Sequence, residues 1–516
     1  MAAVMGRNHL VLVLCVAEAA LMASLGDAAA TGEAPPAPAQ ELRRGFSAAH
    51  DPSYSQFQPV LSDPTGAFAL GFLRVNSTML DLAVVHIPSS FPLWRAMPAR
   101  PAPWSAAASL AFDGGLVLTD RAADEVLWSS APSAAAGDRA VLLDTSNLQI
   151  QSTTSNGSSP GVAWQSFDYP SETIVQGQNL TSAAALYTFD RRFAMRLGSN
   201  YLALYVEPPS AGAAAAAMYW KHTALQAKAQ IVPGGGPTYA RVEPDGFLAM
   251  YQREGPPADV LAFDTFNRGV VALRRVTLEP DGNLRAYYWD GARWALDYTA
   301  ITDPCELPTT CGTYSVCAPS SGGQCACLAN ASDGSGCAAA AAVAGGLCGT
   351  TGGEVGGLYR AVRRRGVEPV NKELLGFERA ASAAECEARC ERNCSCWGTV
   401  YSNGTGYCYL MDYPGQLLVE GDERKLGYFK VRSLEEEEDG GRGGASGAKA
   451  ALLAVGVAAV VAVGAFGAYR VWERRRRGIG DSRQRLGSAD DDGLSPGPYK
   501  NLGSFSSVEL TNSFRR

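Results

Sequence analysis

Polar turns followed by alternating apolar and polar residues recur along the first 300 residues of this chain. The pattern begins at Asp113 (DGGLVLT), Asp144 (DTSNLQIQ), Asp245 (DGFLAMYQ) and Asp281 (DGNLRAYY). Asp-Gly or Ser-Asn supplies the turn, and alternation with a period of two is typical of a strand with one buried face. Because helical periodicity is nearly absent here, the pattern predicts an all-β architecture built from repeats.

Two long apolar segments lie near the ends of the chain. Residues 9–26 follow Arg7 and precede a small-residue stretch at 28–30, which is the arrangement of a secretory signal over residues 1–30. Residues 450–469 contain no charge, and their length suffices to cross a hydrocarbon core of about 30 Å. A buried helix is the alternative for each segment. We expect a single-pass (type I) plasma-membrane protein with its N-terminus outside the cell.

Charge divides the chain at the predicted transmembrane helix. The whole chain carries a formal net charge of −7, whereas residues 470–516 hold ten basic and six acidic side chains. An acidic part outside the cell argues against nucleic acid as a ligand. Residues 433–449 form an acidic, Gly-rich stalk that cannot bury a core, and we expect the cytoplasmic tail at 470–516 to be disordered.

A basic cluster follows this predicted helix, and a face of small residues lies within it. Arg470 and the arginines at 474–477 follow it directly and indicate the cytoplasmic side. Within it, Ala454, Ala458 and Ala462 recur every four residues, a spacing that permits close helix–helix approach. We expect lateral association with a receptor kinase in the same membrane.

Twelve of the thirteen cysteines lie between the two apolar segments. Four of them, Cys386, Cys390, Cys394 and Cys396, crowd into eleven positions and raise the alternatives of a metal site and of disulfides. An oxidising compartment favours disulfides, and zinc sites often add histidine, of which only three remain outside the predicted signal. We therefore expect disulfides, no metal and no cofactor.

A short helix is predicted within this cysteine-rich stretch. Ser382 and Glu385 have the spacing of a capping box, which predicts a helix from Ala383 to about Arg392. Cys386 and Cys390, four residues apart, lie on one face of that helix, so both thiols are expected to point inward together.

Six Asn-x-Ser/Thr sequons occur in the part that we expect to be extracellular, and each is a hypothesis for N-glycosylation. They are Asn76, Asn156, Asn179, Asn330, Asn393 and Asn403, with Asn393 the weakest because a cysteine follows it.

Four short motifs stand out between residues 68 and 170. They are FALGF at 68–72, DGGLVL from Asp113, VLWSS at 126–130 and, most specifically, WQSFDYP at 164–170. Together they resemble the bulb-type, mannose-binding-like lectin domain of plant S-domain receptor kinases. The resemblance implies a bulb-type lectin domain over residues 46–172 and a second, S-locus glycoprotein-like β-prism over residues 173–300.

The later cysteines are similar to the EGF-like and PAN (apple-like) modules of the same family, over residues 301–340 and 348–432. The resemblance therefore implies a mainly β, modular and disulfide-stapled protein with one transmembrane helix. It also implies a set of cysteine pairs. These are Cys305–Cys317, Cys311–Cys325, Cys327–Cys337, Cys348–Cys394, Cys386–Cys408 and Cys390–Cys396.

The resemblance also implies candidate sugar ligands, because bulb-type lectins bind mannose through the strand motif Q-x-D-x-N-x-V-x-Y. The first repeat keeps only Asp113 and Val117, and the repeat in the second prism keeps Asp281, Asn283 and Tyr287. Around Asn147 only the asparagine survives. The degenerate pattern favours an alternative in which Asp-Gly-Asn only forms the hairpin turn.

Catalysis has little support in the sequence. Relatives with this ectodomain usually carry a cytoplasmic kinase, but residues 470–516 are far shorter than one and lack its glycine-rich loop, HRD and DFG motifs. We expect no enzyme. Instead we expect a cell-surface receptor-like protein that recognises a glycan, a peptide or a partner receptor and acts as co-receptor or decoy. The alternative is a structural glycoprotein that faces the cell wall and has no ligand.

Overall fold

The computed structural model describes residues 37–130, 137–152, 161–207, 216–223, 232, 238–319, 322–328, 359–412, 415–419 and 421–432. The expected signal (1–30), stalk (433–449), transmembrane helix (450–469) and tail (470–516) lie outside these residues. The chain divides after Leu434 into two units, and every described residue belongs to the first. Among the described residues, no helix combines the length and the apolar character needed to cross a membrane.

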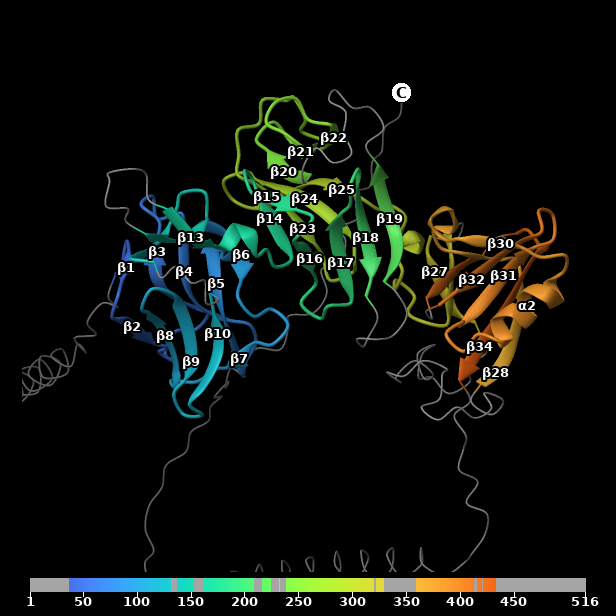
Figure 1. Ribbon diagram of the computed structural model, residues 1–516, viewed down its shortest axis with the longest axis horizontal. Helices are drawn as coiled ribbons and strands as arrows, with labels where there is room; N and C mark the ends of the chain where they lie inside the picture. The colour runs from blue at the N-terminus through green and yellow to red at the C-terminus, as the bar shows by residue number, and fades with distance from the viewer. Residues whose placement is uncertain are drawn as a thin grey trace, which may run out of the picture. The chain divides into compact units, whose positions relative to one another are not determined.

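Three antiparallel sheets surround the core of the first module (Figure 1, blue to cyan). Their strand orders are β3-β4-β5-β6, β1-β11-β12-β13 and β10-β9-β8-β2, and β7 pairs with β5. Strand β1, which precedes residue 46, pairs with β11. The strands are β1 (Leu42–Arg43), β2 (Phe46–Ala49), β3 (Phe57–Ser62), β4 (Phe68–Arg74), β5 (Met79–His86), β6 (Phe91–Arg95), β7 (Ala102–Pro103), β8 (Ala108–Phe112), β9 (Leu116–Asp120), β10 (Glu125–Ser129), β11 (Arg139–Leu142), β12 (Leu148–Ser152) and β13 (Gly161–Gln165).

Three tryptophans, one from each of these sheets, meet edge to face. The ring centroids of Trp94 (β6), Trp128 (β10) and Trp164 (β13) lie 5.8–6.0 Å apart, with interplanar angles of 69–73°. In each strand the residue just before the tryptophan is left out of the pairing register as a β-bulge. The same local device in three sheets gives the first module an approximate threefold repeat.

Three further antiparallel sheets surround a second core (Figure 1, teal to yellow-green). Their orders are β14-β23-β24-β25, β15-β20-β21-β22 and β16-β17-β18-β19. The strands are β14 (Thr173–Val175), β15 (Asn179–Thr181), β16 (Ala185–Tyr187), β17 (Phe193–Leu197), β18 (Tyr201–Val206), β19 (Ala217–Thr223), β20 (Tyr239–Glu243), β21 (Phe247–Tyr251), β22 (Asp259–Ala262), β23 (Arg274–Leu278), β24 (Leu284–Trp289) and β25 (Trp294–Thr299).

The turns predicted from the repeats connect strands in both modules. Each contains one residue with a left-handed backbone, at Gly114, Ser146, Gly246 and Gly282, with φ between 68° and 87°. Glycine adopts this conformation at little cost, which explains why Asp-Gly forms the turn before three of the four strands. The four strands that follow are β9, β12, β21 and β24, so the expectation of turn-and-strand repeats is confirmed.

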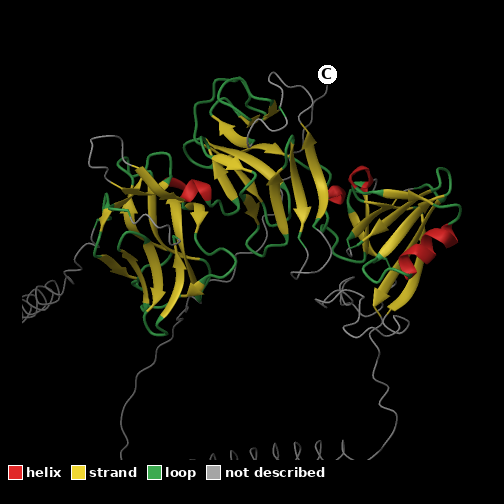
Figure 2. Cartoon of the chain, in the orientation of Figure 1, coloured by secondary structure: helices red, strands yellow, loops and turns green. Residues whose placement is uncertain are grey.

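The cysteine-rich remainder is also mainly β, as Figure 2 shows by its yellow strands. Strand β26, from the expected EGF-like segment, pairs in parallel with β33 of the expected PAN segment. The two segments therefore share the sheet β27-β26-β33-β29 and are not separate layers, and a second sheet has the order β28-β34-β31-β32-β30. The elements are β26 (Ser315–Ala318), β27 (Gln324–Cys327), β28 (Tyr359–Arg365), β29 (Val367–Pro369), β30 (Phe377–Arg379), α2 (Ala383–Glu391), β31 (Gly398–Ser402), β32 (Tyr407–Met411), β33 (Gln416–Val419) and β34 (Lys425–Arg432).

Candidate carbohydrate-binding faces

The β8–β9 turn places Asp113 in solvent, and no described residue hydrogen-bonds its carboxylate. Val117, on β9, lies half-buried on the outer face opposite Ala111, because its neighbours Leu116 and Leu118 point into the core. Asp113 and Val117 thus border one outer face. That face offers only one carboxylate and a small apolar surface among the described residues. These are too few groups to hold a sugar firmly.

The structure separates the three candidates of the β23–β24 repeat by role. Asn283 is buried, its amide donates to the carbonyl of Ile301 over 2.7 Å, and its Oδ1 accepts from the Ile301 N–H over 3.1 Å. Asp281 is exposed, accepts from the Asn283 N–H and forms an ion pair with Arg285 at 2.7 Å. Asn283 therefore fixes the turn to the chain segment that follows β25, and Asp281 braces the turn itself.

Tyr287 is held within the protein. Its hydroxyl donates to Glu279 over 2.8 Å, and the Arg275 guanidinium carbon lies 4.0 Å from its ring centroid. Burial, with the nearby Glu279 carboxylate, raises the pKa of Tyr287. The same Arg275 carbon lies 3.8 Å from the ring of Phe91 in β6 of the first module. These contacts leave little of this face for an external sugar.

A second set of the same residue types occurs on β20 and β21, and the motif comparison missed it. Tyr251 donates to Glu243 over 2.7 Å, and Arg241 lies 4.8 Å from the Tyr251 ring centroid. Burial and the bond to Glu243 raise the pKa of Tyr251 to about 12. Glu243 and Tyr251 are spaced in sequence as Glu279 and Tyr287 are, so alignment of the repeats would have found them.

A ladder of amide side chains runs across the outer face of β11, β12 and β13. Gln165 accepts from Gln149 over 3.3 Å and donates to Asp168 over 2.9 Å. Gln151 donates to Gln149 over 2.8 Å and accepts from Arg139 over 3.1 Å. All but the exposed Asp168 are half-buried, so the ladder lies at the protein surface. Motif matching overlooked this face because glutamines stand where the lectin motif has Val and Tyr.

Asn147, the one motif residue kept on this face, lies beneath the ladder. It is buried, its amide donates to Gln165 over 2.9 Å, and its Oδ1 accepts from the Phe167 N–H over 3.4 Å. Like Asn283, it ties a turn to the chain segment that follows the fourth strand of its sheet. The face therefore has glutamines for hydrogen bonding and an exposed Val162 beside them as an apolar patch.

Four of the disulfides implied by the family resemblance are present. They are Cys305–Cys317, Cys311–Cys325, Cys386–Cys408 and Cys390–Cys396. Cys327 and Cys394 are also disulfide-bonded, whereas their expected partners, Cys337 and Cys348, lie outside the described residues. Among the described side chains, no group of three or more His, Cys, Asp and Glu residues is placed to hold a metal ion.

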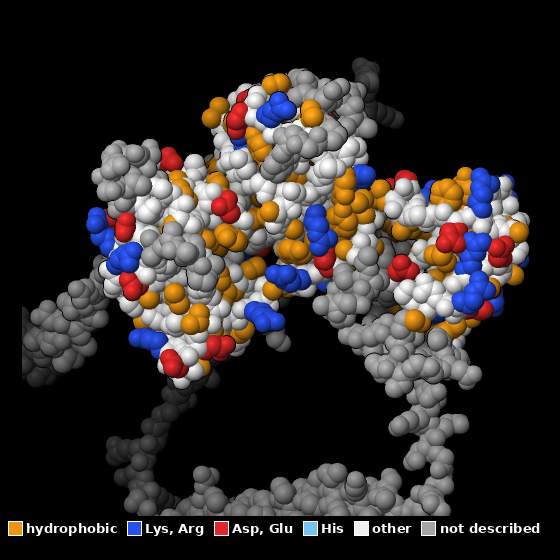
Figure 3. All heavy atoms as spheres, in the orientation of Figure 1, with side chains coloured by type: hydrophobic (Ala, Val, Ile, Leu, Met, Phe, Trp, Pro, Cys, Tyr) orange, Lys and Arg blue, Asp and Glu red, His pale blue; other side chains and the backbone are white. Residues whose placement is uncertain are grey.

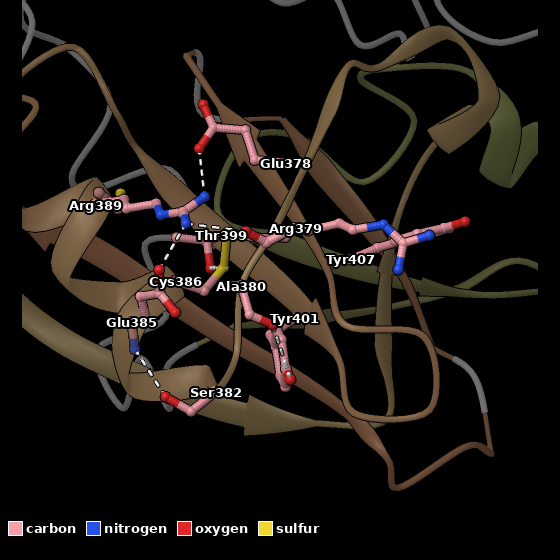
Figure 4. Close-up of a disulfide and its surroundings, with 12 residues drawn as sticks. Glu378, Arg379, Ala380, Ser382, Glu385, Cys386, Arg389, Thr399, Tyr401 and Tyr407 are labelled. Atoms are coloured by element: carbon pink, nitrogen blue, oxygen red, sulfur yellow. Dashed lines mark hydrogen bonds and ion pairs between the residues drawn. A yellow bond between two sulfur atoms is a disulfide. The ribbon is translucent and has the colours of Figure 1, made fainter.

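Helix α2 carries two of these bonded cysteines and begins at the predicted capping box (Figure 4). The Ser382 hydroxyl accepts from the Glu385 N–H over 3.2 Å, and the Glu385 carboxylate accepts from the Ala381 N–H over 2.8 Å. Arg389 ties this helix to Glu378 in β30 at 2.5 Å.

Figure 3 shows blue and red side chains side by side on this module, at the right of the view. The surface is one of mixed charge.

The expected glycosylation sites differ in their surroundings. Asn76, Asn179, Asn393 and Asn403 are exposed, whereas Asn156 and Asn330 lie outside the described residues. The Asn76 side chain accepts from Thr78, and the Asn393 side chain accepts from Ser395, in each case from the hydroxyl residue of its own sequon.

Comparison with known families matches three segments of the chain. Residues 94–191 match the D-mannose binding lectin family, residues 259–331 match the S-locus glycoprotein domain, and residues 368–430 match the PAN domain. A two-domain fetuin-binding lectin of Scilla campanulata, among solved structures, covers 49% of this chain and 98% of its own length. With an identity of 16% and a TM-score of 0.18, this likeness supports no structural conclusion.

Curated relatives extend the likeness to most of the chain. A PAN domain-containing protein of Arabidopsis thaliana is 43% identical over 480 residues, which cover 92% of this chain and 93% of the relative. A G-type lectin S-receptor-like serine/threonine-protein kinase of the same plant is 25% identical over 70% of this chain and 46% of the kinase. A putative receptor protein kinase of Zea mays is 27% identical over 72% of this chain and 46% of the kinase. The matches therefore span less than half the length of these kinases.

Proposed function

From the premise that this chain belongs to the family of the PAN domain-containing protein of Arabidopsis thaliana, with bulb-type lectin, S-locus glycoprotein and PAN domains, we propose that it is a non-catalytic extracellular protein that recognises carbohydrate. Each of its first two modules is, in this proposal, a β-prism. The support for this is three sheets around one core in each module and the threefold tryptophan contact in the first.

The observation that carries the proposal is the glutamine ladder of Gln149, Gln151 and Gln165. Amide side chains both donate and accept hydrogen bonds, as sugar hydroxyls do, and here they line an outer sheet face that is half exposed. The exposed Val162 offers an apolar surface for the C–H face of a sugar ring. The ladder is thus equipped to hold an oligosaccharide along the strands.

Binding to immobilised plant cell-wall oligosaccharides tests this assignment. Each hydrogen bond to a sugar is worth about 0.5–1.5 kcal/mol, so replacing Gln149 and Gln151 together with alanine should weaken binding roughly 5- to 150-fold. Asp113→Ala is the matched control on another sheet of the same module and should leave that binding unchanged. Equal binding by the double variant and the native protein would reject the ladder as the site.

Free mannose should bind no more tightly than millimolar. Ala111, Gly115 and Thr119 stand where the motif has Gln, Asn and Tyr, so three hydrogen-bonding side chains are lost or shortened at the first repeat. Calorimetry that finds micromolar mannose binding, abolished by Asp113→Ala, would contradict this expectation.

The signalling role is a further part of the proposal: the protein works at the plasma membrane as a co-receptor or decoy beside a receptor kinase. The kinases among its relatives support this, because they are similar to 70–72% of this chain. Recovery of a receptor kinase with the full-length protein from native membranes is the expected result. Replacing Ala454, Ala458 and Ala462 with leucine should reduce that recovery without reducing surface delivery.

A structural glycoprotein without a ligand is the second candidate. One specific observation favours it: Asn147, Asn283 and Tyr287, which occupy sugar-binding positions of the motif, are all engaged in bonds within the protein. The two candidates separate on oligosaccharide arrays. Failure of the full chain to bind any glycan, with its association with partners intact, would favour the structural role.

A further inference from the structure

The outer face of the β15–β20 pair brings a sequon next to an aromatic cluster. Asn179 lies directly opposite Arg241, and Thr181 lies opposite Tyr239, whereas Leu180 between them points into the core. Residues directly opposite on antiparallel strands project from the same face, with Cβ atoms about 4.5–5.5 Å apart. The Asn179 side chain therefore emerges beside Arg241.

The cluster offers both an apolar surface and hydrogen-bonding groups. The rings of Tyr239 and Tyr251 stack with centroids 5.2 Å apart at an interplanar angle of 17°. The Tyr239 hydroxyl donates to Glu254 over 3.2 Å, and the Glu254 side chain is 84% exposed. Arg241 is 23% exposed and forms an ion pair with Glu243 at 2.7 Å. Tyr239 and Arg241 form the accessible edge of this cluster.

Asn179 has the surroundings of a modified asparagine. Its side chain is exposed, and no described residue hydrogen-bonds it, unlike Asn76, which is held by Thr78 of its own sequon. It lies on β15, the terminal strand of its sheet, where a bulky polar group also hinders edge-to-edge pairing with other chains.

We propose that Asn179 carries an N-linked glycan whose first N-acetylglucosamine packs on Tyr239 and Arg241, so that this lectin-like face holds the protein's own sugar. The donor is a lipid-diphosphate-linked oligosaccharide. A bond forms between Asn179 Nδ2 and the anomeric carbon of the sugar, and the bond from that carbon to the diphosphate oxygen breaks. The amide loses one proton, and the lipid diphosphate leaves.

This arrangement assigns different partners to the two modules. The β15–β20 face takes a covalently attached sugar, and the face at Arg275 is closed by Phe91 of the first module. External glycans are then left to the first module, in agreement with the glutamine ladder there. The inference rests on the proposed function, because N-glycosylation requires the secretory route.

The test uses the full-length protein from plant cells and starts with glycopeptide mass spectrometry. Peptides that contain Asn179 should be glycosylated. Thermal unfolding of native, Asn179→Gln, Tyr239→Ala and doubly substituted proteins then measures the coupling between glycan and ring. Loss of the glycan should lower the unfolding midpoint by about 2–4 °C when Tyr239 is present and by much less in Tyr239→Ala.

Asn76→Gln is the matched control. Its sequon lies between β4 and β5, away from this cluster, so its effect should simply add to that of Tyr239→Ala. Additive effects of Asn179→Gln and Tyr239→Ala would overturn the packing of sugar on ring. An unmodified Asn179 alongside a modified Asn76 or Asn403 would overturn the inference and leave the extracellular proposal standing. Absence of glycan at every sequon would overturn both.

Discussion

Replacing Asp297 with alanine should destabilise the second module strongly, because it leaves a buried guanidinium without its charged partner. Arg274 Nη1 lies 2.5 Å from Asp297 Oδ2, and the two side chains are 1% and 0% exposed. Asp297 also accepts from the N–H and the hydroxyl of Thr265, over 2.9 and 2.7 Å. Arg274 donates further to the carbonyls of Pro244 and Val270. Every strong bond of the carboxylate would be lost at once.

The magnitude follows from this burial. Removing one partner of a buried ion pair costs about 3–5 kcal/mol, because the remaining charge stays out of water without compensation. At roughly 2–4 °C per kcal/mol for a domain of this size class, the unfolding midpoint of the module should fall by roughly 6–20 °C. Asp297→Asn keeps the shape but not the charge and should fall between alanine and the native protein.

Differential scanning calorimetry of the full chain provides the measurement. The matched control is Asp290→Ala, because Asp290 pairs at 3.5 Å with Arg293, whose side chain is 82% exposed; exposed pairs of this kind contribute about 0–1 kcal/mol. Arg274→Met and the double variant complete a cycle that isolates the pairing energy. If Asp297→Ala and Asp290→Ala shift the midpoint equally, burial does not make the Arg274 pair important and the reasoning fails.

Three more outcomes are expected. Burial raises the pKa of Asp81 to about 6, so its protonated form favours the folded state below about pH 4, and this contribution is lost as the pH rises to 6. Melting points of the native and Asp81→Asn proteins, measured from pH 4 to 7, should show that only the native protein loses this contribution. Ser382→Ala removes the cap to the Glu385 N–H and should cost about 1 kcal/mol in chemical unfolding, whereas Ser382→Asp should not. Arg275→Ala removes the contact with Phe91, and calorimetry should then show the first two modules unfolding more independently.

Local features of this chain were predictable because nearby residues determine them. Asp-Gly turns, strands of period two and the Ser382 cap each depend on a few consecutive positions, and the structure contains all of them. The four described cysteine pairs followed from the family resemblance, since spacing alone does not define connectivity. The pairing of β26 with β33 joins residues about a hundred positions apart and left no local signal.

Alternation along a strand predicts which side chains are buried, but not which partners they meet. Asp297 is the extra residue where β25 slips against β24, and it is buried beside Arg274. Strict alternation from the exposed Leu296 would also place Asp297 inside, but would give no partner for its charge. Arg274 reaches it from β23, two strands away, and only the folded sheet brings the two together.

The asparagine of the lectin motif shows how a motif count can mislead about function. In two repeats of this chain it is buried and hydrogen-bonded to the segment that follows the fourth strand of its sheet, through Gln165 and Phe167 for Asn147 and through Ile301 for Asn283. Losing either amide would leave buried polar backbone without a partner, so folding alone requires it. Its presence therefore reports on the turn, whereas sugar recognition has to be judged from amide groups that lie partly exposed and keep a second N–H or lone pair for a ligand. By that criterion the glutamines of the β12 face outrank Asn283, although they match no letter of the motif.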